Sequence, residues 1–163
     1  MNEALSRRIS QATFSDPLQE ALLSLLVTAN TLNDLMDELC ERHHITRPQY
    51  NVLRILRGVH PRGHARCEIA RRMIDRAPDV TRLVDRLQAR GLVRRFRGLD
   101  DQRQAMTSIT AKGLKLLAKM QPEIDAAVGA RLGKLSDDDC RELSRLCGEI
   151  LEPDSVETEA AAG

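Results

Sequence analysis

Apolar residues recur at helical spacing along most of this chain, and the clearest case is the stretch of residues 75–91. Val80, Leu83, Val84 and Leu87 follow the i, i+3, i+4, i+7 pattern of one buried helix face. This stretch therefore predicts an amphipathic helix whose opposite, polar face can approach another molecule. The candidate contact residues in its first turn and on that face are Pro78, Asp79, Thr81, Arg82 and Arg86.

Two short runs of β type follow this helix and are separated by a polar, turn-rich segment. The runs are LVRRFRG and AMTSIT, and four arginines lie in or between them. Upstream, the pattern predicts a short helix at about residues 67–74, with Ile69, Ala70 and Met73 facing inward. A short helix, a longer helix and a basic hairpin in this order are typical of a winged helix-turn-helix.

Further apolar helices flank this unit. Between residues 16 and 44, apolar residues alternate in steps of four and three, which gives a heptad-like seam. After the hairpin, Thr110 can cap a long helix in which Pro122 predicts a kink or a break, and Ser136 opens a last helix. So wide an apolar surface needs a partner, which we expect to be a second copy of the chain. The candidate dimerisation residues are Leu18, Leu22, Leu25, Leu143, Cys147 and Ile150.

These patterns predict a mostly α fold with a small β-hairpin wing, in which a winged helix-turn-helix lobe is carried on a helical dimerisation stalk. At 163 residues the chain is long enough to bury a core of its own. The expected divisions are a flexible N-terminus (1–15), an N-terminal dimerisation helix (16–44), a winged helix-turn-helix DNA-binding domain (45–110), C-terminal dimerisation helices (111–152) and a disordered tail (153–163).

The net charge of +1 hides a strong asymmetry along the chain. Residues 45–110 contain 15 Arg, no Lys and 6 acidic residues, which is a balance of +9, whereas the two flanks together carry −8. A basic centre between acidic arms indicates a nucleic-acid-binding unit, although a solvated charged surface would explain part of it. The exclusive use of Arg favours nucleic acid, because guanidinium groups match phosphate oxygens and guanine edges.

The four cysteines form no CxxC pair, which is consistent with reduced thiols in the cytoplasm. Cys40 and Cys67 are the candidate redox sensors, on the condition that cationic neighbours lower their pKa values. Cys140 and Cys147 lie on an apolar stripe and are expected to be buried. Neither an export signal nor a membrane span is recognisable in the sequence, so we expect a soluble cytoplasmic protein without a membrane partner.

The sequence also lacks the patterns typical of enzymes and metal sites. It has no Gly-rich phosphate loop, no HExxH and no GxSxG. His43, His44, His60 and His64 offer nitrogen ligands, but no carboxylate or thiolate completes a recognisable zinc spacing. We therefore expect no catalysis, no cofactor and no metal.

The runs ITRPQYNVLRIL, EIARRM, DVTRLVDRLQARGLVRR and DDQRQAMTSITAKG together resemble the MarR family of bacterial transcriptional regulators. The resemblance covers about residues 45–114, and it implies a dimer with two winged helix-turn-helix lobes on a helical stalk. Its most specific part is the wing, where Asp101, Arg103 and Thr110 match the family pattern and Ile109 replaces the Leu of that pattern, a mild change. Gln102 stands where a second Arg is common, and this difference weakens or re-tunes the expected contact at the wing.

Elementary chemistry gives the wing residues separate roles. Arg103 at the tip is placed to enter the minor groove, and Asp101 would orient it, which the resemblance also implies. Side chains alternate along a strand, so Arg94, Arg95 and Arg97 cannot all face DNA, and we favour Arg95 and Arg97 as DNA contacts. For Asp85 we expect an arginine partner rather than DNA, because a carboxylate repels phosphate.

The expected function is that of a sequence-specific regulator of transcription that binds double-stranded DNA as a homodimer on a palindromic operator. The resemblance implies a repressor relieved by a small aromatic or lipophilic effector. Two alternatives stay open: a regulator of the same fold switched by cysteine oxidation, and a winged-helix module that binds only other proteins.

Overall fold

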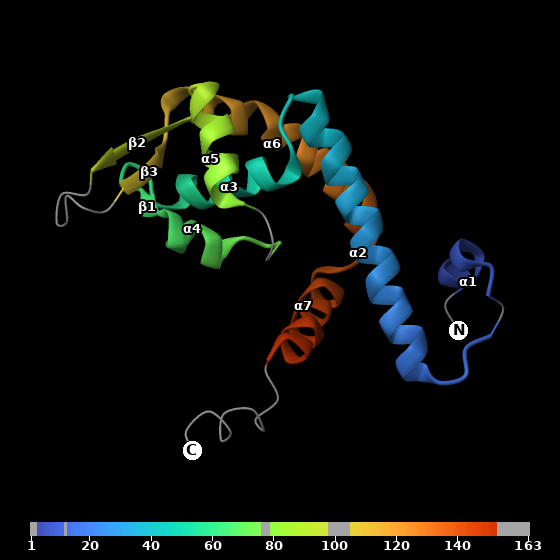
Figure 1. Cartoon of the computed structure of the whole chain (residues 1–163). Helices are drawn as coiled ribbons and strands as arrows, with labels where there is room; N and C mark the ends of the chain where they lie inside the picture. Colours follow the sequence, from blue (N-terminus) through green and yellow to red (C-terminus); the bar gives the residue numbers. More distant parts are fainter. Residues whose placement is uncertain (1–2, 12, 76–78, 98–104, 153–163) are drawn as a thin grey trace, which may run out of the picture. The chain divides into compact units, whose positions relative to one another are not determined.

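The computed structural model describes residues 3–11, 13–75, 79–97 and 105–152. The chain divides into two units, Met1–Ile124 and Asp125–Gly163. Among the described residues, no helix has the length and apolar character needed to cross a lipid bilayer. The elements in chain order are α1 (Glu3–Ile9), α2 (Pro17–Arg42), α3 (Arg47–Gly58), β1 (His64–Ala65), α4 (Arg66–Arg72), α5 (Val80–Ala89), β2 (Val93–Arg97), β3 (Ala105–Ile109), α6 (Ala111–Leu132) and α7 (Asp137–Leu151), as labelled in Figure 1.

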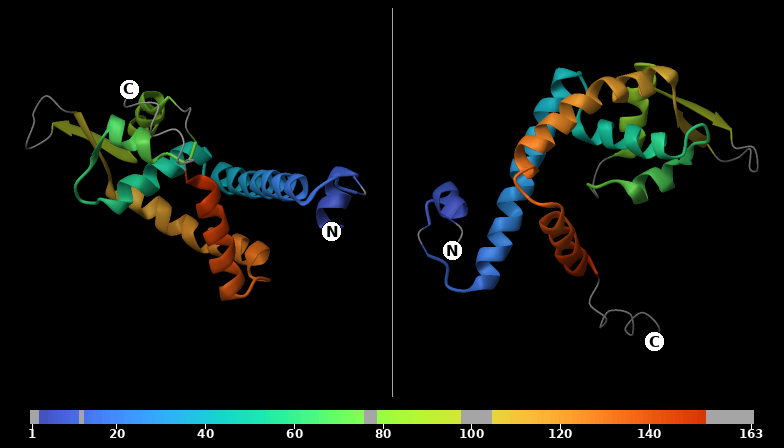
Figure 2. Two further views of the ribbon diagram at one scale, coloured as in Figure 1. Left: turned by 90° about the horizontal axis from the view of Figure 1, so that it is seen from below. Right: turned by 180° about the vertical axis from the view of Figure 1, so that it is seen from behind.

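The three strands form one antiparallel sheet in the order β1-β3-β2. Val93 pairs with Ile109 and Arg97 with Ala105, so β2 and β3 are the arms of a hairpin. Both views in Figure 2 show this hairpin projecting from the packed helices of its unit. Its position is that of the wing predicted from the sequence, and the mostly helical fold with a small sheet is confirmed.

The core of the first unit is aliphatic and lies between the helices and the sheet. Its members come from α2, α3, α4, α5 and α6, which explains how a chain without Trp fills its interior. The largest fully buried side chains include Leu39, Leu53, Leu56, Ile69, Leu87, Leu117 and Met120.

Local sequence signals explain where several helices begin. Thr46 caps α3 in a capping box, because its side chain accepts from the backbone N–H of Gln49 and the Gln49 side chain accepts from the backbone of Thr46. Ser136 and Asp139 form the same arrangement at the start of α7, as the sequence predicts. Such caps pair N–H groups that the first turn of a helix leaves without partners.

The C-terminus of α2 is tied to α6 by one carboxylate. Glu123 accepts a hydrogen bond from Arg42 Nη2 at 3.1 Å, and its other oxygen lies 3.0 Å from His43 Nε2. The His43 side chain is only 6% exposed, so this pairing holds a polar group inside the unit.

Several expectations differ from the structure. The sequence predicts a flexible segment 1–15, but this segment contains α1, because Leu5 is buried where α1 packs against α2. The helix α6 continues through Pro122, so the alternative of a break there is wrong. Ala70, which the apolar pattern places on the inward face, is exposed.

The strand β1 is not predicted by the sequence, because its two residues are too few to show the alternation of apolar and polar positions that marks a strand. The strand exists through its pairing with β3, in which His64 lies opposite Thr107. A Cβ atom on Gly63 would lie 2.3 Å from the Thr107 carbonyl oxygen, so glycine is required for this close approach.

Candidate DNA-binding interface

The helix α5 has one buried face and one exposed face. Val80, Leu83, Val84 and Leu87 are all buried, as the apolar pattern predicts, and they fix the helix against the rest of the unit. The outward face therefore projects its polar side chains into solvent. Its exposed residues include Thr81, Arg82, Asp85 and Arg86.

Asp79 caps the N-terminus of α5. Its Oδ1 atom accepts a hydrogen bond from the backbone N–H of Arg82 at 3.2 Å, and its Oδ2 atom lies 3.3 Å from Arg82 Nε. Asp79, which the sequence makes a candidate contact residue, therefore acts as a helix cap in the structure. The Arg82 side chain is 80% exposed, and the weak pairing with Asp79 leaves it able to move to another acceptor. Pro78 lies outside the described residues.

The arginines of β2 point to opposite sides of the wing. Arg95 Nη2 lies 2.7 Å from Asp85 Oδ1, so Arg95 faces α5. Arg94 Nε donates to Ser108 Oγ at 3.2 Å, and its guanidinium carbon lies 5.8 Å from the centre of the Phe96 ring. The alternation expected along the strand is therefore present.

Asp85 has the arginine partner that the sequence led us to expect, and the structure identifies it as Arg95. Arg97 is exposed and lies two residues farther along β2 than Arg95. The wing residues Asp101 and Arg103 lie outside the described residues, and their pairing stays a prediction.

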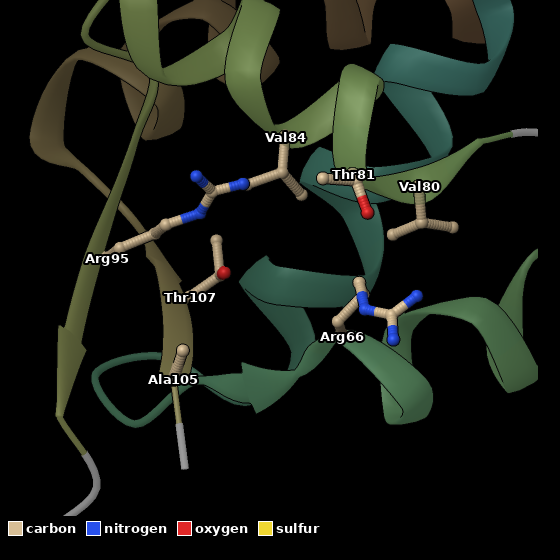
Figure 3. A pocket seen from close by; sticks show the side chains of 7 residues that line it. All are labelled: Arg66, Val80, Thr81, Val84, Arg95, Ala105 and Thr107. Atoms are coloured by element: carbon tan, nitrogen blue, oxygen red, sulfur yellow. The ribbon is translucent and has the colours of Figure 1, made fainter. Parts of the chain in front are cut away.

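A pocket of about 270 Å³ lies between α5, the wing and the start of α4. Figure 3 shows Arg95 reaching from β2 across this pocket toward α5, and Arg66 entering from the first turn of α4. The other lining residues are Val80, Thr81, Val84, Ala105 and Thr107. The pocket thus brings two guanidinium groups and the Thr81 hydroxyl to one side of the molecule.

Arg66 does not stand out in the sequence, where it is one of seven arginines between residues 47 and 72. The other six are Arg47, Arg54, Arg57, Arg62, Arg71 and Arg72. The signal that distinguishes Arg66 is its place directly after β1, at the first residue of α4. Arg47, another of the seven, is 24% exposed and pairs with Asp37 at 3.3 Å and with Asp75 at 3.3 Å, so its role is internal.

The geometry suits an extended polyanion. Arg82, Arg86, Arg95 and Arg66 are exposed on neighbouring elements, and guanidinium groups bind phosphate oxygens or guanine edges through paired hydrogen bonds. An exposed helix whose polar face carries such groups fits the major groove of B-form DNA.

Five of the six predicted dimerisation residues are exposed in the single chain, and the sixth, Cys147, is half-buried. On α2, the exposed fractions are 76% for Leu18, 55% for Leu22 and 36% for Leu25. On α7, Leu143 is 43% exposed and Ile150 65%. No described residue of α7 is buried, which is unusual for a helix with an apolar stripe.

The four cysteines are all free thiols, but their surroundings differ from those expected. Burial raises the pKa of the Cys40 thiol to about 11, helped by the nearby carboxylate of Asp37. The condition for redox sensing, a lowered pKa, therefore fails at Cys40. Cys67 is exposed at the surface of α4. Cys140 is exposed and Cys147 half-buried, which differs from the expectation that both thiols are buried.

A second pocket, of about 320 Å³, lies between α2, α3 and the segment that follows α4. Its lining is mixed, with polar, charged and apolar side chains. The lining residues are Asn33, Met36, Arg47, Tyr50, Asn51, Arg54, Ile74 and Asp75. Within the part of the chain that the structure describes, no three His, Cys, Asp or Glu side chains are grouped so as to hold a metal ion.

Comparison with known proteins gives consistent results. The MarR family model matches residues 45–105. The homoprotocatechuate degradative operon repressor of Escherichia coli is 24% identical over 134 residues, which are 79% of this chain and 86% of that protein.

Solved structures extend the likeness to most of the chain. A MarR transcription factor from Planctomyces limnophilus is 39% identical, with a TM-score of 0.63, and the match covers 83% of this chain and 98% of that one. A cysteine-to-serine mutant of MarR from E. coli in complex with operator DNA is 24% identical, with a TM-score of 0.69, over 85% of this chain and 100% of that one. The identity with the Planctomyces protein over nearly its whole length shows that this chain belongs to the MarR family of transcriptional regulators.

Proposed function

We propose that this regulator binds a palindromic operator as a homodimer, with one α5 helix of each copy in the major groove. The observation that carries this proposal is the exposed face of α5, where arginines stand beside Arg66 and Arg95 from neighbouring elements. One lobe makes few base contacts, whereas two lobes related by a twofold axis read two half-sites about 10 base pairs apart, or a multiple of that. The E. coli MarR mutant, which is similar in fold, was solved in complex with operator DNA, and this supports a DNA-binding function.

The proposed contacts follow from the chemistry of each side chain. Arg82 reads a guanine edge, with Thr81 and Arg86 beside it on the same exposed face. Arg66, Arg95 and Arg97 contact phosphates. Further contacts are proposed for residues that the structure does not describe. Pro78 makes an apolar contact with a base, and Arg103, oriented by Asp101, enters the minor groove.

Dimerisation is proposed through α2 and α7, which each expose an apolar row. An exposed leucine row has no stabilising role in an isolated chain, but it buries apolar area when a second copy covers it. The division into dimerisation segments (16–44 and 111–152) and a DNA-binding domain (45–110) is part of this proposal.

We further propose that the protein is a repressor, as the homoprotocatechuate degradative operon repressor of E. coli is by name. A small molecule that binds in the pocket between α2 and α3 would relieve this repression. The protein would act by binding, without catalysis. Cysteine oxidation is the less favoured switch, because the pKa of Cys40 is raised.

A salt-dependent DNA titration tests the proposal. The purified protein is titrated with random-sequence duplex DNA at several salt concentrations, and then with duplexes enriched from a random pool. We expect affinity to fall steeply with salt, because phosphate contacts release counterions, and we expect the enriched sequences to be palindromic. Arg82→Glu with Arg86→Glu should abolish binding. Arg7→Glu with Arg8→Glu makes the same change of charge on α1, outside the proposed DNA-binding and dimerisation segments, and should leave binding intact. Absent or salt-independent binding would instead favour a protein-interaction module.

A further inference from the structure

One carboxylate at the start of α5 holds Arg82 at two points. Asp79 Oδ1 accepts a hydrogen bond from the backbone N–H of Arg82 at 3.2 Å, and Asp79 Oδ2 lies 3.3 Å from Nε of the same residue. The capping bond fixes the direction of the carboxylate, because the N–H that it binds belongs to the first turn of the helix. Oδ2 is therefore an anchor at a defined place beside the Arg82 side chain.

The contact at Nε determines which edge of the Arg82 guanidinium stays available. A guanidinium group is planar and carries five N–H donors, one on Nε and two on each terminal nitrogen. Guanine presents O6 and N7 side by side in the major groove, and two parallel N–H donors match this pair of acceptors. Arg82 can therefore keep Asp79 at Nε and offer its Nη1 and Nη2 edge to a guanine at the same time.

The Asp79 carboxylate itself needs a cationic partner when DNA is bound. It is 55% exposed at the end of the helix that we place in the groove, where phosphates repel it. In water an exposed ion pair of this kind contributes little. When DNA displaces water from this face, the effective dielectric constant falls and the attraction within the pair increases. Release of Arg82 to a phosphate would leave Asp79 unpaired beside the DNA, so contact with DNA favours the paired arrangement.

Arg86 provides a comparison on the same exposed face. It lies one helical turn after Arg82, and among the residues that the structure describes no carboxylate lies within ion-pair distance of it. Asp85, its neighbour in the chain, pairs instead with Arg95 at 2.7 Å. An arginine without a fixed partner can follow phosphates over a wide range of positions, whereas Arg82 is partly ordered before it meets a base. We therefore expect the two arginines to differ in sequence discrimination.

We propose that Asp79 is a specificity-determining positioning residue, which holds the Arg82 guanidinium at Nε so that its Nη1 and Nη2 edge meets a guanine of the operator. This inference rests on the proposed function, in which α5 occupies the major groove. Without the carboxylate, Arg82 still reaches DNA, but its side chain must be ordered on binding and can turn to phosphates of any sequence. The charge of Asp79 also repels the phosphates of a non-cognate duplex, so the same residue acts against non-specific binding.

The first experiment separates the anchor from the helix cap. Asn and Ser cap helices about as well as Asp, so Asp79→Asn and Asp79→Ser keep the cap and remove the charged anchor. Fluorescence anisotropy at one salt concentration measures the Kd of the full-length proteins for a scrambled duplex and for an enriched operator. We expect the ratio of these two Kd values, scrambled over operator, to fall about threefold to tenfold in both variants, which is the cost of ordering one long side chain.

The second experiment asks whether the effect passes through Arg82. Asp79→Asn is repeated in the Arg82→Ala protein and, as a matched control, in the Arg86→Ala protein, and the two double-mutant cycles are compared. We expect no further fall of the ratio in Arg82→Ala and the full fall in Arg86→Ala. Replacing single operator guanines by 7-deazaguanine, which lacks the N7 acceptor, locates the base that Arg82 reads. At that base the loss of affinity should be smaller in Asp79→Asn than in the wild type.

The outcomes separate this inference from the proposed function. If the wild type does not bind duplex DNA, or binds all sequences alike, the proposed function is wrong and the inference falls with it. If the wild type discriminates and both Asp79 variants keep its ratio, Asp79 only caps the helix or only repels phosphate, and the positioning role is refuted. A fall of the ratio that persists in Arg82→Ala would assign Asp79 a base contact of its own, such as the N4 amino group of cytosine, and would refute the route through Arg82. Far-UV circular dichroism and urea midpoints check that each variant has folded with α5 intact.

Discussion

Replacement of Gly113 by alanine tests how the wing is joined to the rest of its unit. Gly113 lies in the first turn of α6, and its N–H donates to Thr110 Oγ1 at 3.1 Å. A Cβ atom at this position would lie 2.4 Å from the carbonyl oxygen of Leu92 and 2.7 Å from Ile109 Cγ1. The Leu92 carbonyl belongs to the backbone just before β2, and it also accepts a hydrogen bond from the N–H of Thr110 at 3.0 Å. Moving Leu92 away from the added methyl group would therefore weaken the hydrogen bond that joins the start of β2 to the start of α6.

The expected magnitude follows from opposing terms. Alanine gains at most about 1 kcal/mol over glycine inside a helix. Inserting a methyl group into a packed site costs about 1–3 kcal/mol, and weakening the Thr110 hydrogen bond adds about 1 kcal/mol. Gly113→Ala should therefore lower the free energy of unfolding by about 1–3 kcal/mol, the sum of these terms.

Gly129 provides a matched control in the same helix. No atom lies within 4 Å of a Cβ atom built there, so Gly129→Ala should stabilise the protein by about 0.5–1 kcal/mol. Urea unfolding is followed by circular dichroism at one protein concentration, because the apparent stability of a dimer depends on concentration. If both variants shift the free energy of unfolding in the same direction, a steric clash at position 113 is not what distinguishes the two glycines.

Three further predictions concern the interface, the dimer and the thiols. Arg82→Ala should reduce the preference for an enriched operator over a scrambled duplex by about 1–3 kcal/mol in competition binding, whereas an equal loss on both duplexes would make Arg82 a phosphate contact. Leu22→Glu places a charge on the exposed seam of α2 and should give monomers in sedimentation velocity, while Leu22→Met stays dimeric; a dimeric Leu22→Glu protein would exclude this face from the interface. Because burial raises the pKa of Cys40 to about 11, very little of this thiol is in the reactive thiolate form at about pH 8. A thiol reagent at that pH should therefore label Cys67 in the native protein and Cys40 only after unfolding, as read by mass spectrometry; rapid native labelling of Cys40 would contradict its burial.

The sequence by itself determined the helices other than α1, several of their caps and the charge of the central region. The buried face of α5 is a repeat of apolar residues within ten positions, and the caps at Thr46, Asp79 and Ser136 act on N–H groups two or three residues away. Such features depend on neighbours in the chain, so they can be read without tertiary structure.

The tertiary structure alone decided which distant residues meet. The strand β1 exists because His64 reaches Thr107, and α1 persists because Leu5 finds a buried site against α2. Arginines that look equivalent in the sequence acquire different roles, since Arg47 is held between two carboxylates while Arg66 is exposed beside α5. The burial that raises the pKa of Cys40 comes from packing that no local pattern encodes. The physical reason is that contact, burial and desolvation are set by residues far apart along the chain, which only the folded arrangement brings together.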